Sequence, residues 1–411
     1  MTRPGTGDQG PAARAGDTAT GVGSDPQAVV VDTLLPGAGN FQVIEDPAYA
    51  ASGSGEHLYL EIEKEGLTTD VVAQVLAKAC GVAGHAVGFA GRKDRHGITR
   101  QWFSVHFGQE TQIPAEHVDR GGKFKVVAVS RHKNKLRPGH LAGNRFRLGV
   151  RLADPGATAT RLATLASAGI PNRFGSQRFG VNGSSLALAR AWGAGDLAAA
   201  AAVCVDPFGG WKPGDPLPGG FRHPPEGLVL GALRRRPEDY AGALRASGDQ
   251  MRKLAASAAQ AAIFNAVYDA RAAAGILHRL RSGDLALAAN GAPFLVIDSD
   301  LDDVNRRAAP GVLDVVASGP LPGTWRLRPS PAVVAEEQAW AAGTGIDWTW
   351  LAADGRLESP GERRALVIRF RSPPVLEPDA DRHWLSFALP SGAYATEVLA
   401  AVGIAVPLDR R

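Results

Sequence analysis

Hydrophobic and polar residues alternate along EHLYLEIEK (residues 56–64), so that Leu58, Leu60 and Ile62 share one face. A period of two predicts a half-buried strand. The next segment, TTDVVAQVLAKACG (residues 68–81), changes to the apolar spacing of a helix, with a threonine at its start and a glycine at its end. These start and stop signals predict a helix that directly follows the strand.

Further apolar patterns predict strands at residues 86–90, 101–107 and 124–129. Another strand is predicted for NRFRLGVRL (residues 144–152), where apolar and basic side chains occupy opposite faces: Phe146, Leu148, Val150 and Leu152 on one, and Arg145, Arg147 and Arg151 on the other. The order strand, helix, strand, strand, strand predicts an α+β sheet, because a regular βαβ repeat would place a helix between successive strands.

The pattern changes after residue 170. Ala-rich stretches at 184–202 and 249–274 predict helices, and the Pro/Gly-rich segment 206–227 predicts a loop between them. Strands return at 365–370 and 383–389, and a turn and a closing helix follow. Strands at both ends and helices between them predict one sheet domain interrupted by an insertion, with these boundaries: a tail at 1–27, the sheet domain at 28–169 and 355–411, and the insertion at 170–354.

The composition is typical of a globular chain. Of its 411 residues 45% are apolar, enough to bury a sizeable core. No apolar run approaches the roughly 18 residues of a membrane span, and residues 1–27 lack the apolar segment of a signal peptide. The two cysteines, Cys80 and Cys204, lie far apart, which favours a reducing compartment over a disulfide framework. We therefore expect a soluble cytoplasmic protein with a disordered tail at 1–27.

The charge is uneven, although the net charge is only +4. Residues 120–153 contain no Asp or Glu and carry a series of cations: Arg120, Lys123, Lys125, Arg131, Lys133, Lys135, Arg137, Arg145, Arg147 and Arg151. Such a stretch suits a polyanion, because neutralising phosphates releases counterions. It is equally typical of a solvated face whose acidic partners come from elsewhere in the chain.

One carboxylate lies among cations in the glycine-bounded loop GFAGRKDRHGITRQW (residues 88–102). Nearby cations favour the charged form of Asp94, and an ionised aspartate that projects from a loop can serve as a nucleophile, a base or a metal ligand. The alternative is a surface aspartate paired with a neighbouring arginine, which contributes little stability. Loop chemistry alone does not decide between them.

Other motifs narrow the chemistry. The ten histidines show no spacing typical of metal ligands, and the chain has no nucleophile elbow, phosphate loop or dinucleotide fingerprint. Asn144 and Phe146 share a strand face, where an amide beside a ring could bind and stack a nucleobase. NRFGSQRFG (residues 172–180) could likewise bind RNA. For both segments the alternative is structural, either a core strand or a tight turn.

The loop GFAGRKDRHGITRQWFSV resembles the signature of the TruD family of tRNA pseudouridine synthases. Further segments resemble this family in the same order: RHKNKLRPGHLAGNRFRL, IPNRFGSQRFGVNGSS, AIFNAV, GPLPG and LPSGAYATEVL. The likeness runs from about residue 41 to residue 400. Several separated motifs in one order are far more specific than any single motif.

The resemblance implies a fold, an activity and a set of site residues. The fold would be a pseudouridine synthase fold with a mixed, largely antiparallel sheet, interrupted by an inserted, mainly helical α/β domain. Asp94 would be the catalytic aspartate, which attacks the uridine nucleoside while uracil is detached, rotated and rejoined through C5, without cofactor or metal. Other positions match the family's uracil pocket: Phe41, Asn144, Phe146 and Tyr394. Cations expected to contact the RNA backbone are Lys93, Arg95, Lys133, Lys135, Arg137 and Arg178. The implied partner is tRNA, modified at uridine 13 in bacteria.

The sequence departs from the family's pattern just before Phe41. The family tends to carry a basic residue and then Pro-Glu-Asp there, whereas this chain has LLPGAGNF (residues 34–41). We expect Arg92, or an arginine of the strand at residues 145–151, to supply the missing positive charge near Asp94. In an extended segment neighbours alternate sides, so Arg92 is expected beside Asp94 and Lys93 away from it.

Three functional hypotheses remain open. The first is an RNA pseudouridine synthase, and the second is an RNA-binding relative with lost or weak catalysis, for which the missing basic residue argues. The third, from outside the family, is a hydrolase or phosphotransferase that uses Asp94 as its nucleophile. Product formation on uridine-containing RNA separates the first from the second, and dependence on a divalent metal separates the third from the first.

Overall fold

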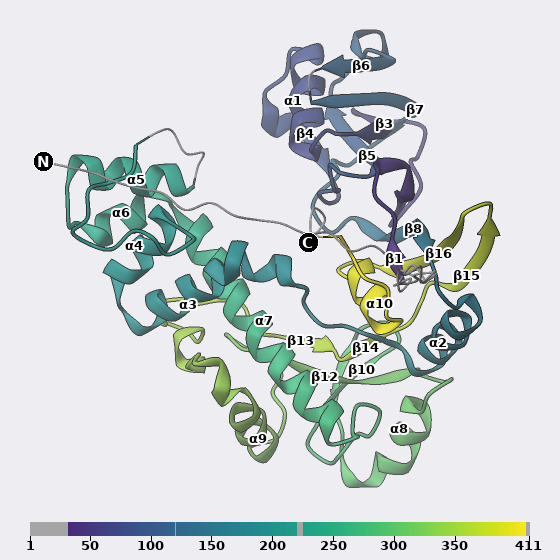
Figure 1. The fold of residues 1–411 in the computed structure, drawn as a ribbon, viewed down its shortest axis with the longest axis vertical. Coiled ribbons are helices and arrows are strands. Elements are labelled where there is room, and N and C mark those ends of the chain that lie inside the picture. The colour runs from purple at the N-terminus through teal and green to yellow at the C-terminus, as the bar shows by residue number, and fades with distance from the viewer. Residues whose placement is uncertain (1–31, 120, 220–224, 408–411) are drawn as a thin grey trace, which may run out of the picture. The chain divides into compact units, whose positions relative to one another are not determined.

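The computed structural model describes residues 32–119, 121–219 and 225–407. The predicted tail at 1–27 and Arg120 lie outside the described residues. Figure 1 shows how the described elements follow one another along the chain. Within these residues no helix combines the length and the apolar character that crossing a membrane would require.

The larger sheet has the strand order β15-β16-β8-β2-β5-β3-β7-β6, and β1 pairs with β8 and β4 with β5 beside this path. Its strands are β1 (Thr33–Leu34), β2 (Phe41–Pro47), β3 (His57–Glu65), β4 (Val87–Phe89), β5 (Ile98–His106), β6 (Glu116–Asp119), β7 (Gly122–His132), β8 (Leu141–Arg151), β15 (Ser372–Asp379) and β16 (Arg382–Pro390). β2 and β5 run parallel, and the other pairs are antiparallel. The sheet is thus mixed and largely antiparallel.

The predicted strand at 56–64 and helix at 68–81 are confirmed as β3 and α1 (Thr69–Cys80). The Thr68 side chain caps α1 by accepting from the Val71 amide at 3.2 Å, and Gly81 ends it with φ +64°. In β8 Phe146, Leu148 and Val150 are buried and the three arginines are exposed, as the alternation predicts. The local patterns therefore identified these elements correctly.

One face of the large sheet carries its core. Ile62 pairs with Gln101, and Val43 pairs with both Thr99 and Phe146, so all these side chains share that face. At one end α1 packs on Leu58, Leu60 and Ile62. At the other end α10 (Ala395–Ala401) and α2 (Pro155–Ala168) cover β8 and β16. The surface between these two groups of helices holds the pocket described below.

The second part of the fold combines helices with a smaller sheet of order β11-β10-β12-β13. Its elements are α3 (Ser184–Ala194), α4 (Leu197–Val205), α5 (Glu226–Arg235), α6 (Tyr240–Ala246), α7 (Asp249–Ala273), β10 (Leu285–Ala288), β11 (Pro293–Leu295), α8 (Leu301–Ala308), β12 (Val315–Leu321), α9 (Pro331–Ala341) and β13 (Glu362–Ala365). The long helix α7 lies against β12 (Figure 1). The single helix expected at 184–202 is two helices, because Gly195 adopts φ +86° and Asp196 caps a new start.

Strand pairing bears on the predicted boundary at residue 354. β13 lies beyond that boundary, yet it pairs with β12, and its Arg363 forms a buried ion pair with Glu337 of α9 at 2.6 Å. β14 (Val367–Ile368) then pairs with β9 (Ile170–Pro171). The domain division stays a prediction, and these pairings favour a second boundary near residue 368.

Candidate active site

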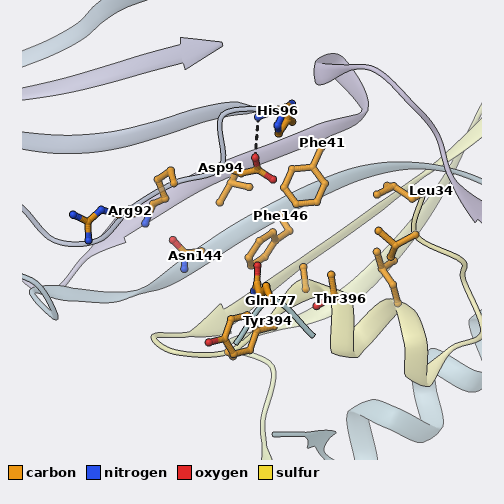
Figure 2. Close-up of a pocket in the computed structure, with 16 residues that line it drawn as sticks. Leu34, Phe41, Arg92, Asp94, His96, Asn144, Phe146, Gln177, Tyr394 and Thr396 are labelled. Carbon is orange, nitrogen blue, oxygen red and sulfur yellow. Dashed lines mark hydrogen bonds between the residues drawn. The ribbon is translucent and has the colours of Figure 1, made fainter. Parts of the chain in front are cut away.

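The loop between β4 and β5 presents Asp94. The Asp94 carboxylate oxygen Oδ1 accepts a hydrogen bond from the His96 amide at 2.8 Å, which forms a tight Asx turn. Gly97 follows in close contact with β2, since a Cβ atom there would lie 2.5 Å from the Phe41 carbonyl oxygen. The turn and the glycine together hold the exposed Asp94 side chain next to the Phe41 ring (Figure 2).

A pocket of about 570 Å³ opens beside this loop. It brings together the predicted nucleophile and every residue predicted for the uracil site: Asp94, Phe41, Asn144, Phe146 and Tyr394. These residues come from the loop before β5, from β2, from β8 and from the segment before α10. Figure 2 shows Asp94 and Phe41 along one side and Tyr394 with Gln177 and Thr396 across from them. The volume lies in the range of small-ligand sites.

Asn144 offers an unused acceptor in this pocket. Its side-chain oxygen Oδ1 is buried and has no hydrogen-bond partner among the described residues. A buried polar atom without a partner is costly, so such atoms in native proteins commonly await a ligand or water. Phe146 lies two residues on and stacks on Phe387, with ring centroids 5.3 Å apart. An acceptor beside aromatic rings suits the edge and face of a nucleobase.

Lys93 is placed differently from the prediction. Its ammonium group lies 2.7 Å from the Glu45 carboxylate, and the two side chains are 6% and 1% exposed. Lys93 also lines the pocket, together with Arg92 and Asp94, so the side chains of three successive residues reach it and the expected alternation along the loop fails. A buried ion pair leaves Lys93 with little access to an RNA backbone.

The arginines expected to replace the missing cation do not face Asp94. Arg145 pairs with Asp46 at 2.8 Å, and Arg147 stacks over Trp384 at 4.0 Å. These two side chains lie on the sheet face opposite Phe146. Arg92 lines the pocket, but its guanidinium pairs with Asp70 at 2.9 Å and points away from Asp94 (Figure 2). Arg151 is exposed and in phase with Arg145 and Arg147, so it shares their face. The expectation that Arg92 or an arginine of this strand takes over the role is therefore wrong in its geometry.

Lys64 is the cation that sequence reasoning missed. It is 1% exposed, and its ammonium donates to the carbonyl oxygens of Asp94 and Leu67, each at 2.8 Å, and of Lys93 at 3.3 Å. Burial lowers the pKa of Lys64 to about 8, the Lys93 charge lowers it too, and the Asp94 charge opposes the shift. The alternation of Leu58, Leu60 and Ile62 continues in phase to Lys64, so the strand pattern already held the signal.

Two more buried side chains hold the same loop. The hydroxyl of Thr69 accepts from the Lys93 amide at 2.9 Å, and Gln101 donates to the Gly91 carbonyl at 3.0 Å. Thr69 and Gln101 also bond to each other at 2.8 Å. The backbone around Asp94 is thus fixed by side chains from β3, α1 and β5. Such support holds the carboxylate in one geometry, as a reacting group would require.

The other predicted RNA contacts differ in their availability. Arg95, Lys133 and Arg137 are exposed, whereas Lys135 donates to the His85 carbonyl. The Gly139 amide bonds to the Ala90 carbonyl at 2.8 Å, so the basic segment after β7 packs against the start of the Asp94 loop. Arg178 is half-buried and donates to Ser257 at 2.9 Å and to the Tyr394 hydroxyl at 3.4 Å. Arg178 thus contacts a pocket residue through a long hydrogen bond.

Replacing Tyr394 with phenylalanine is expected to change little. The hydroxyl that distinguishes this chain from the family's usual phenylalanine accepts, among the described residues, only a long hydrogen bond from Arg178. Arg178 would keep its bond to Ser257 in the variant. We expect a stability loss below about 1 kcal/mol and turnover within about threefold of the unmodified chain. Thermal melts and steady-state rates measure both. A large fall in turnover would show that the hydroxyl contacts the substrate.

The described residues contain no group of three or more His, Cys, Asp or Glu side chains placed to hold a metal ion. The site therefore consists of a carboxylate, an amide and aromatic rings in a base-sized pocket, with a buried ammonium behind the loop.

A solved structure shows which class of protein has this fold. The structure of a putative tRNA pseudouridine synthase D (TruD) from Methanosarcina mazei superposes with a TM-score of 0.68 at 24% identity, covering 91% of this chain and 93% of that one. The present chain thus has the pseudouridine synthase fold.

Sequence comparison gives the family. The family model for tRNA pseudouridine synthase D (TruD) matches residues 36–209 and 215–402. A tRNA pseudouridine synthase D from Geobacter metallireducens is 37% identical over 392 residues, which cover 90% of this chain and 94% of the relative. Another from Xanthomonas campestris is 35% identical over 388 residues, with 93% and 94% covered. The chain belongs to the TruD family, as its motifs predicted.

Proposed function

We propose that this protein converts uridine to pseudouridine in tRNA, with Asp94 as the nucleophile. The observation that carries the proposal is the pocket itself, where the Asp94 carboxylate, the Phe41 ring and the unpartnered Asn144 oxygen meet. Relatives that match nearly the whole chain are named tRNA pseudouridine synthase D. The finer assignment, uridine 13, is the target that the family resemblance suggests, and a tRNA substrate implies a cytoplasmic enzyme.

The reaction is a balanced isomerisation. The bond between uracil N1 and the ribose breaks, a bond between C5 and the ribose forms, C5 loses its proton and N1 gains one. Asp94 attacks the nucleoside, and the bond that it forms breaks again when C5 joins the ribose, so the carboxylate is restored. The pocket retains the detached uracil as it turns. The base must first leave its stack, which costs a few kcal/mol and is offset by stacking in the pocket.

Asn144 would make the pocket selective for uracil over cytosine. Its buried oxygen, which has no partner among the described residues, can accept a hydrogen bond. Neutral uracil carries an N3–H donor that neutral cytosine lacks. Cytosine has an acceptor at N3, so it would leave the Asn144 oxygen unpaired and place two acceptors opposite each other. A site with a buried polar group discriminates strongly against a ligand that cannot satisfy it.

Release of tritium tests the proposal directly. A tRNA transcript containing [5-³H]uridine releases its label to water when C5 loses its hydrogen and bonds to the ribose. We expect release in the presence of EDTA, followed by mapping of one modified position. Binding without release would support a relative that has lost catalysis. RNA cleavage or phosphate release that stops with EDTA would instead support the hydrolase or phosphotransferase hypothesis.

RNA binding is expected to depend on salt through the basic segment after β7. Replacing Lys133 and Arg137 together with glutamine should lower the slope of log affinity against log salt by roughly 1.4 to 1.8, at about 0.7 per single-strand and 0.9 per duplex contact. Lys78→Gln, an exposed lysine at the end of α1, is the matched control and should leave the slope unchanged. An unaltered slope in the double variant would place this segment outside the RNA footprint.

The second part of the fold contributes to the same pocket. Gln177, from the segment that follows β9, lines it beside Tyr394 and Thr396. We infer that the inserted domain, predicted at residues 170–354, supports the pocket and helps to select the RNA.

A further inference from the structure

Lys64 is buried behind the catalytic loop and plays no part in the reaction as described so far. Its ammonium contacts three backbone carbonyl oxygens, those of Leu67, Lys93 and Asp94. Two of these belong to the loop that carries the nucleophile. The charged form of lysine has three N–H donors and no acceptor, so three carbonyls satisfy it fully.

The neutral amine cannot make the same contacts. It has two N–H donors and a lone pair, so one of the three carbonyl oxygens would face a lone pair instead of a proton. Since Asp94 and Lys93 supply two of the three carbonyls, loss of one bond frees part of the loop. A buried carbonyl without a donor is also costly, which favours a shift of the loop backbone.

We propose that protonated Lys64 is a positioning residue, which holds the main chain of Lys93 and Asp94 so that the Asp94 carboxylate reaches the substrate. The proposal rests on the proposed function of Asp94. It assigns Lys64 the role of the positive charge behind the loop, in a chain that lacks the basic residue expected before Phe41. Lys64 acts through the backbone and does not itself line the Asp94 pocket.

The proposal predicts an alkaline limit on turnover. The charges that act on Lys64 are those of Asp94, which favours the ammonium, and Lys93, which opposes it. Several charged side chains on neighbouring elements are paired with one another: Glu63 with Arg100 and Lys125, Glu65 with Lys123, and Arg92 with Asp70. Glu116 of β6 lines a separate pocket together with Lys64. As the pH rises through the lowered Lys64 pKa of about 8, turnover at saturating tRNA should fall, approaching tenfold per pH unit.

Stability should move in the opposite direction, which separates this effect from alkaline unfolding. A lysine in the unfolded chain keeps its proton to about pH 10.4, whereas folded Lys64 loses it near 8. Between these values the unfolded state binds more protons, so the contribution of Lys64 to stability rises with pH. Thermal melts at pH 7 and 9 should show the unmodified chain gaining relative to Lys64→Met while its turnover falls.

The experiment measures pseudouridine formation from pH 6.5 to 9.5 with the full chain and three variants. At pH 7, Lys64→Met should lower kcat by roughly 10- to 100-fold, the cost of a small misplacement of a catalytic group, with KM within about threefold. Its rate should show no further fall near pH 8. Lys64→Arg, which keeps its charge across this range, should recover part of the rate and should not show the fall in kcat near pH 8. Lys78→Met, an exposed lysine in α1, should behave like the unmodified chain.

Each outcome bears on the inference. Any of three results would overturn it. They are a kcat of the unmodified chain that does not change with pH, a folded Lys64→Met variant with normal kcat, and an active Lys64→Arg variant whose kcat still falls near pH 8. If neither Lys64 variant folds, the profile and the melts of the unmodified chain decide. Absence of product from the unmodified chain at every pH would instead overturn the proposed function, and this inference with it.

Discussion

Replacing Asp94 with asparagine is expected to abolish pseudouridine formation while tRNA affinity stays within about threefold. Asparagine keeps the oxygen that accepts from the His96 amide, so the Asx turn is preserved. What it loses is the second carboxylate oxygen and the negative charge, and with them the nucleophile. Removal of a nucleophile costs on the order of 10⁴- to 10⁶-fold in turnover, which places the variant below detection in a tritium-release assay.

The chain offers a matched control for this substitution. Asp119 also forms an Asx turn, with its carboxylate accepting from the Gly121 amide at 2.6 Å, and it lies outside the Asp94 pocket. Asp119→Asn should therefore behave like the unmodified chain in rate and affinity. Filter binding and tritium release on the same samples separate binding from chemistry. Pseudouridine formation by purified Asp94→Asn would refute the role assigned to Asp94.

The members of the pocket could be predicted from sequence because they come from separated motifs in a fixed order. Phe41, Asp94, Asn144, Phe146 and Tyr394 lie far apart in the chain, yet all line one pocket. Local patterns also predicted β3, α1 and the two faces of β8 correctly. In each case the information was local, either a motif or a hydrophobic period.

The ion-pair partners of Arg92 and Lys93 could not be predicted in the same way. The partner of Arg92 is Asp70 on α1, and the partner of Lys93 is Glu45 on β2, so each choice depends on contacts far away in sequence. The rule of alternating sides assumed a regular extended loop, whereas Arg92, Lys93 and Asp94 all line the same pocket. The predicted boundary at 354 also rested on local patterns, whereas β13 joins the smaller sheet through its long-range pairing with β12.

Breaking the buried pair of Lys93 and Glu45 is expected to have the largest effect on stability. Both side chains are almost fully buried and 2.7 Å apart, and the second Glu45 oxygen accepts from the Trp102 amide at 3.3 Å. Lys93→Met leaves a buried carboxylate without its cation, which typically costs about 3–5 kcal/mol. Urea unfolding should show this loss as a lower midpoint with an unchanged m value.

A second variant separates the loss of stability caused by the unpaired Glu45 charge from the role of the pair in turnover. In Lys93→Met combined with Glu45→Leu both charges are gone, and replacing a whole buried pair by apolar residues is often close to neutral. We therefore expect the double variant to recover most of the lost stability. Turnover should stay reduced by about tenfold or more, because the pair fixes the loop to β2 beside the nucleophile and displacement of a catalytic group slows the reaction.

The matched control is Lys123→Met, which breaks the exposed pair with Glu65 and should cost less than about 1 kcal/mol of stability. Equal stability losses in Lys93→Met and Lys123→Met would show that the buried pair contributes no more than a surface contact. Full turnover in the double variant would show that it serves the fold alone.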